Sequence, residues 1–93
     1  MKLEVINGAV FIDGERELAL QAFSHGRPLP PQGGRSLETM LEWFDAAIGD
    51  IYPHVDRCPE EYIGLVLDRQ YLRMVERGQI VAAERINSDA KNT

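Results

Sequence analysis

The sequence predicts a single α+β domain in which one layer of sheet packs against helices. Three observations support this class: a hairpin signal near the N-terminus, two long segments with helical apolar spacing, and a length of 93 residues, which suffices for one core but not for two. We expect the order ββαααβ, that is, an N-terminal β-hairpin, about three helices and a C-terminal edge strand. Residues 1–86 would form this domain, and residues 87–93 a polar, flexible tail.

The N-terminal segment KLEVINGAVFID carries the hairpin signal. Apolar and β-branched residues form two short runs, and Asn7-Gly8 between them supplies the positive φ angles of a two-residue type I′ turn. The pattern predicts strands over 2–6 and 9–13. Because a hairpin alone is marginal in water, another element must cover or extend it.

Residues 15–23 are compatible with two structures. Their apolar residues alternate, which suits a third strand, but the segment contains no β-branched residue. Asp13 can cap a helix here, and His25-Gly26 before a proline can end one. We therefore predict a helix.

The following stretch, SHGRPLPPQGGRS over 24–36, contains three prolines, three glycines and no acid. The prolines predict an extended arm over 27–32. The stretch could hold an anion at the start of the next helix, or it could be a stiff connector that spaces the hairpin and first helix from two longer helices. We favour the connector, because neither a Walker-type Lys-Ser/Thr nor a Rossmann strand accompanies the glycines. The residues of the anion site would be Arg27, Gly33, Gly34, Arg35 and Ser36.

The segment SLETMLEWFDAAIG predicts a helix with Ser36 as its N-cap and Gly49 as its C′ stop. Its apolar residues follow the i, i+3, i+4, i+7 spacing of a helix with one buried side. They are Leu37, Met40, Leu41, Phe44 and Ile48, with Trp43 and Ala47 widening the stripe. The opposite face carries an acidic stripe of Glu38, Glu42 and Asp45.

A second long helix is predicted over 59–77. Asp56 or Cys58 can cap it, Pro59 suits its first turn, and Gly78 closes it. Its apolar residues cover most of the circumference, so the helix is either central to the core or has one face that meets a partner. These residues are Tyr62, Ile63, Leu65, Val66, Leu67, Tyr71, Leu72, Met74 and Val75.

Arg69, Arg73 and Arg77 recur at every fourth position and so line one face of this helix. A solvated arginine face is one interpretation. The guanidinium groups could instead bind phosphates, or pair with the acidic stripe, within one chain or between two.

After Gly78 the sequence predicts a strand over 79–84. The stretch YLRMVERGQIVAAERI resembles winged-helix DNA-binding domains, in which a recognition helix ends at a glycine and continues into a strand. The resemblance implies a nucleic-acid-binding regulator that uses the face of Arg69, Arg73 and Arg77. Two features depart from it: no short helix with a tight turn precedes Pro59 at the right distance, and the adjacent segment is acidic.

Composition bounds the function further. The net charge is −5, and residues 36–61 hold a single arginine against seven acids, which disfavours generic binding to phosphate backbones. No apolar run reaches the ~18 residues of a membrane helix, and the N-terminus lacks the apolar region of a signal peptide. The one cysteine cannot form an internal disulfide. We expect a cytoplasmic protein.

Catalytic and metal-binding patterns are weak. His54, Cys58 and Asp56 with the distant His25 could hold zinc, but paired Cys-x-x-Cys or His-x-x-x-His ligands are missing. A Cys58 nucleophile is disfavoured by the acids that follow it, which oppose a thiolate. We predict no enzymatic activity, no metal and no cofactor.

The sequence thus favours a small acidic, non-enzymatic protein-binding module, such as an adaptor, an inhibitor or an assembly factor, with homodimerisation as one option. The nucleic-acid-binding regulator is the alternative. Aromatic residues and arginine dominate binding energy at interfaces, and Trp43 lies at a stripe edge where a core role is commoner. The predicted contact residues are Trp43, Tyr62, Arg69, Tyr71, Leu72, Arg73 and Arg77.

Overall fold

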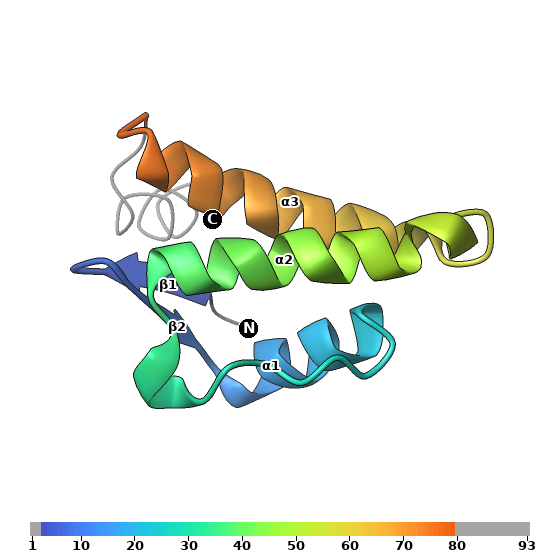
Figure 1. Ribbon diagram of the computed structural model, residues 1–93, viewed down its shortest axis with the longest axis horizontal. Helices are drawn as coiled ribbons and strands as arrows, with labels where there is room; N and C mark the ends of the chain where they lie inside the picture. Colours follow the sequence, from blue (N-terminus) through green and yellow to red (C-terminus); the bar gives the residue numbers. More distant parts are fainter. Residues whose placement is uncertain (1–2, 80–93) are drawn as a thin grey trace, which may run out of the picture.

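The computed structural model describes residues 3–79, which form a two-stranded antiparallel sheet followed by three α-helices (Figure 1). This confirms the predicted α+β class. The elements are β1 (Leu3–Ile6), β2 (Ala9–Ile12), α1 (Gly14–Phe23), α2 (Leu37–Ile51) and α3 (Pro59–Glu76), with short 3-10 turns η1 (Gln32–Gly34) and η2 (Tyr52–His54). The tail over 87–93 and, apart from Gln79, the predicted strand over 79–84 lie outside the described residues.

The hairpin forms as predicted; β2 ends one residue earlier than expected, and residue 2 lies outside the described residues. Asn7 and Gly8 have φ angles of 51° and 79°, as the type I′ turn requires, and Val5 pairs with Val10. The buried side chains of the two strands are Leu3, Val5, Val10 and Ile12. Since side chains alternate along a strand, one face of the hairpin packs on the helices and the other faces outward.

The chain returns to the hairpin just before α2. The Val10 N–H donates to the Arg35 carbonyl at 2.7 Å, and the Leu37 N–H donates to the Gly8 carbonyl at 2.9 Å. Ala9 and Ser36 form an isolated antiparallel bridge. These bonds cover part of the β2 edge and place the start of α2 against the hairpin.

Residues 15–23 are helical, which settles the choice between helix and strand. The Asp13 carboxylate accepts from the Arg16 N–H at 2.8 Å, so it caps α1 as predicted. The helix packs on α3 closely enough that a Cβ added at Gly64 would lie 2.8 Å from Cε2 of Phe23. The glycine therefore permits the approach of the two helices.

Helix α2 begins as predicted, because the Ser36 hydroxyl accepts from the Thr39 N–H at 3.1 Å. The predicted stop at Gly49 is wrong, since the helix continues to Ile51. The Ile51 side chain is fully buried, and burying an isoleucine contributes about 1.5–3 kcal/mol, more than the ~1 kcal/mol that glycine costs inside a helix. Pro53 then lies in the 3-10 turn that follows.

Helix α3 matches its predicted span of 59–77 to within one residue. Cys58 occupies the N-cap position without a capping side-chain bond, and Arg77 occupies the C-cap. Gly78, with a φ of 71°, closes the helix.

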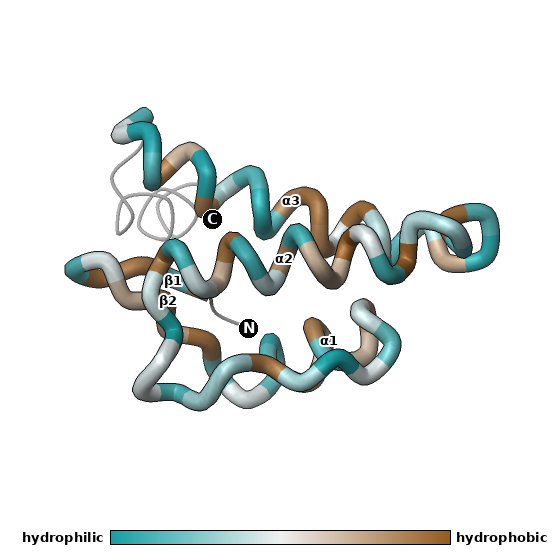
Figure 2. The backbone as a smooth tube through the Cα atoms, viewed as in Figure 1, coloured by the Kyte–Doolittle hydropathy of each residue, from teal (hydrophilic) through white to brown (hydrophobic). Residues whose placement is uncertain are grey.

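The core lies between the hairpin and the three helices. Helix α3 runs beside α2 and also contacts α1 (Figure 1). Figure 2 shows hydrophobic residues interspersed with hydrophilic ones along α2 and α3, as expected for helices buried on one side. The largest fully buried side chains are Leu20, Met40, Phe44, Ile51, Leu65 and Leu72. No helix within residues 3–79 is long and apolar enough to span a membrane.

Candidate functional site

The predicted anion site is not available to a ligand, because Arg35 is used inside the molecule. Only 6% of this residue is exposed. Its Nε donates to the Pro30 carbonyl at 2.7 Å, and its Nη2 lies 2.9 Å from the Glu17 carboxylate. The guanidinium therefore joins the proline arm to α1, and its charge is already paired.

The other residues of the predicted anion site either form hydrogen bonds within the chain or are exposed to solvent. The Ser36 hydroxyl serves as the cap of α2. Gly33 and Gly34 are exposed in η1, and the Gly34 N–H donates to the Pro31 carbonyl at 2.8 Å. The structure thus contradicts the alternative interpretation of this segment as an anion site.

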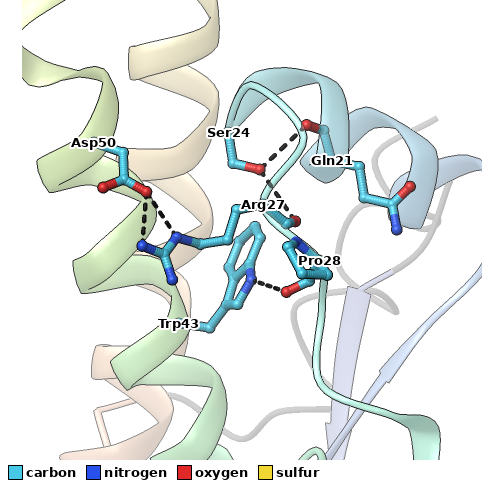
Figure 3. A network of polar contacts seen from close by, with 6 residues as sticks. All are labelled: Gln21, Ser24, Arg27, Pro28, Trp43 and Asp50. Carbon is cyan, nitrogen blue, oxygen red and sulfur yellow. Dashed lines mark hydrogen bonds and ion pairs between the residues drawn. The ribbon is translucent and has the colours of Figure 1, made fainter.

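Arg27 fastens the other end of the arm to α2, as Figure 3 shows. Its Nε and Nη2 lie 2.8 Å and 2.7 Å from Oδ2 of Asp50. Nearby, Trp43 Nε1 donates to the Pro28 carbonyl at 2.9 Å. The arm is therefore a strap bound along α2. The predicted role as a spacer is wrong, because α1 packs directly on α3.

Three of the predicted contact residues lie in the core. Trp43 is 6% exposed, Tyr71 3% and Leu72 0%. The indole of Trp43 also packs edge-on against Phe44, with ring centroids 5.1 Å apart. Their selection as surface contacts is wrong, because their large apolar surfaces fill the space between the helices. Aromatic character alone did not distinguish core from surface.

Two of the three arginines that were predicted as contact residues form ion pairs within the chain, both with Asp45 of the acidic stripe. Arg69 Nη1 lies 3.1 Å from Asp45 Oδ1, and Arg73 Nη2 lies 3.3 Å from Asp45 Oδ2. One carboxylate thus serves two guanidinium groups across α2 and α3. Arg77 is exposed and forms no ion pair with another residue in 3–79. The three arginines therefore carry more positive charge than the Asp45 carboxylate neutralises.

Tyr62 is the remaining predicted contact. It is partly buried, packs against the core, and its ring centroid lies 6.1 Å from that of Tyr52. Tyr52 itself is 58% exposed. This pair lies at the η2 end of α3, where its hydroxyl groups and ring edges can contribute to a contact at the rim of a docking surface.

The candidate site is the outer face of α3, defined by Ile63, Val66, Leu67, Gln70 and Met74. Ile63 is 53% and Leu67 55% exposed, although leucine and isoleucine are commonly buried. A shallow groove beside them is lined by Val66, Arg69, Gln70, Arg73, Met74, Arg77 and Gln79. Apolar and cationic groups thus lie next to one another on a single helix.

The sequence analysis selected the three arginines beside this face as contact residues, but it did not select Ile63 and Leu67, the two most exposed apolar residues of the face. Ile63 and Leu67 are one helical turn apart, a spacing visible in the sequence. The missing information was which side of α3 the rest of the chain covers. Only that knowledge separates Leu67 from the fully buried Leu65 and Leu72.

The residues considered as zinc ligands do not converge. The Cys58 thiol is buried and donates to the His54 carbonyl at 3.2 Å, so it is directed at backbone. The rings of His25 and His54 are 6.0 Å apart by centroid. In the part of the chain that the structure describes, no three His, Cys, Asp or Glu side chains gather as a group that could hold a metal ion.

The arrangement on α3 therefore offers a surface suited to binding: a ridge of apolar side chains with a row of guanidinium groups beside it. No protein-family model, no curated protein and no solved structure matches the chain.

Proposed function

We propose that the protein is a small acidic, non-enzymatic protein-binding module that docks a helix of its partner on the outer face of α3. The observation that carries the proposal is the exposure of Ile63 and Leu67, 53% and 55%, one turn apart on a helix whose other side is in the core. Since each is already about half buried, docking would gain roughly 1 kcal/mol per side chain. Apolar patches rimmed by polar groups mark such interfaces.

A helix is the partner element that fits this face best. The backbone N–H and C=O groups within α3 are bonded along the helix, so a docking segment gains nothing from strand pairing there. Side chains must supply the contacts, and rows at three- and four-residue spacing interdigitate with those of another helix. Acidic groups on the partner would meet the exposed Arg77 and the partly paired Arg73.

Charge distribution supports a protein partner over nucleic acid. Asp45 binds both Arg69 and Arg73, and a phosphate would have to compete with this carboxylate. The net charge of −5 adds general repulsion. The proposal also includes a cytoplasmic location, which the single, buried and unpaired Cys58 supports.

The proposal is tested by comparing three forms of the full chain as bait in a lysate of the organism that encodes it. Leu67→Glu places a charge in the centre of the outer face. Leu18→Glu is the matched control, because Leu18 is 69% exposed on α1. We expect the wild type and Leu18→Glu to retain the same bound chain, either a second copy or another protein, and Leu67→Glu to lose it.

Two results would contradict this function. One is a bound chain that Leu67→Glu retains as well as the wild type does, since the contact would then lie elsewhere. The other is binding to random duplex DNA at about 50 mM salt that weakens as salt rises and disappears in Arg73→Ala. That outcome would establish the nucleic-acid-binding alternative.

A further inference from the structure

Four residues of the outer face of α3, all except Val66, belong to a longer seam with a regular repeat. Along the helix, alternating steps of three and four residues select one continuous row of side chains. These residues are Glu60, Ile63, Leu67, Gln70, Met74 and Arg77. A repeat of three and four is the pattern with which two helices pack side chains of one into gaps of the other.

Within residues 3–79, this seam lies on the side of α3 opposite the core. Ile63 and Leu67 flank the fully buried Leu65 by two residues on either side, a rotation of about 200° around the helix. Gln70 and Met74 flank the fully buried Leu72 in the same way. In an ordinary coiled coil the seam is the buried side, whereas here the opposite side of α3 is buried in the core. As far as residues 3–79 are concerned, the seam is therefore open to a second helix.

We propose that the seam binds the same seam of a second copy of this chain, with the two α3 helices antiparallel and a two-fold axis between Leu67 and Gln70. The inference rests on the proposed function and specifies its partner. In this arrangement Ile63 faces Met74 of the second copy, and Leu67 faces Gln70 of the second copy. A two-fold interface requires such self-complementarity, because both copies contribute the same surface.

The charges at the two ends of the seam select the antiparallel orientation. Glu60 lies in the first turn of α3 and Arg77 at its C-cap, so antiparallel packing brings each Glu60 to an Arg77 of the second copy. Parallel packing would place glutamate against glutamate and arginine against arginine. Within residues 3–79 Arg77 forms no ion pair, so it is available for this contact.

Gln70 is the polar member of the central layers of this arrangement. It is the one uncharged polar residue of the seam and is exposed. With the axis beside it, Gln70 of each copy lies near the centre of the interface.

The first test measures mass by sedimentation equilibrium between about 1 and 100 µM, the range in which a small helical interface of this kind should dissociate. We expect wild-type protein to reach twice the chain mass of 10.5 kDa. Leu67→Glu should raise the dimer Kd at least about 100-fold, since it affects two central layers. Leu18→Glu, exposed on α1, should leave the Kd unchanged. Circular dichroism verifies that each variant is folded.

The second test establishes the orientation by exchanging charges. Glu60→Arg and Arg77→Glu should each raise the Kd roughly tenfold, because both ends of the dimer then bring like charges together. The double variant Glu60→Arg/Arg77→Glu should recover the wild-type Kd to within about threefold, since the exchanged charges are again opposite. Independently, oxidation of Ile63→Cys/Met74→Cys should link residue 63 of one copy to residue 74 of the other, as read by peptide mass spectrometry.

Several outcomes overturn the inference. They are a wild-type monomer at the highest concentration, a dimer insensitive to Leu67→Glu, a double charge variant without recovery, or a link between two residues 63. A monomer whose capture of another protein is still abolished by Leu67→Glu would refute the second copy as partner and retain the proposed function. If the wild type is a monomer and Leu67→Glu also leaves the capture of another protein unchanged, both the second copy as partner and the proposed function are refuted.

Discussion

Replacing Gly49 by alanine tests where helix α2 ends, which is the point at which the expected and the observed helix differ. Sequence pattern assigned Gly49 to the left-handed position that ends a helix, whereas the structure places it inside α2, which ends at Ile51. Its φ is not in the positive range, in contrast to Gly8, Gly26 and Gly78. A Cβ added at this position would meet no atom within 4 Å.

The expected magnitude follows from this geometry. Alanine loses less backbone entropy than glycine on entering a helix, which stabilises a helix by about 0.5–1 kcal/mol. No steric cost offsets the gain, because the site is open to solvent. For a domain of this size, such a change raises Tm by about 2–8 °C.

The assay is thermal unfolding followed by circular dichroism, with Gly78→Ala as the control of opposite sign. Gly78 has a φ of 71°, where a Cβ costs about 1 kcal/mol or more, so this variant should lower Tm. A lower Tm for Gly49→Ala would refute the reasoning, because it would mean that Gly49 adopts the left-handed conformation and ends the helix.

Two further predictions concern the strap. Arg35→Ala should lower the free energy of unfolding by about 2 kcal/mol in urea titration, because it removes a buried guanidinium from Glu17 and Pro30. Arg27 is only partly buried, so Arg27→Ala should cost less than about 1 kcal/mol, and equal losses would contradict the difference in burial. Trp43→Phe should cost about 1–2 kcal/mol, since it removes the hydrogen bond to the Pro28 carbonyl; an unchanged urea midpoint would show that this bond does not hold the strap.

Local structure was predictable where its cause lies within a few residues. The Asn7-Gly8 turn requires only the φ angles that these two residues tolerate. The caps at Asp13 and Ser36 each accept a hydrogen bond from an N–H three residues ahead. These interactions depend little on the rest of the molecule, and the hairpin and the starts of α1 and α2 match the expectation.

The errors arose where a distant contact outweighs a local preference. Burial of Ile51 carries α2 through Gly49. Contacts of Arg27 and Pro28 with α2 turn an expected spacer into a strap. In both cases the partner that decides the outcome belongs to another part of the chain, and no pattern of neighbouring residues contains it.

For the candidate site, too, one part was predictable from the sequence and another part depended on tertiary contacts. Sequence alone determined that a helix lies within residues 59–77, with apolar groups around most of its circumference and arginines along one face. Such a helix has no intrinsic buried side, because nearly every orientation hides apolar surface. The tertiary structure decided the orientation: α2 and α1 pack against α3, whose Leu65 and Leu72 are fully buried, and α1 approaches at Gly64. Ile63 and Leu67 are exposed because neither helix lies on their side.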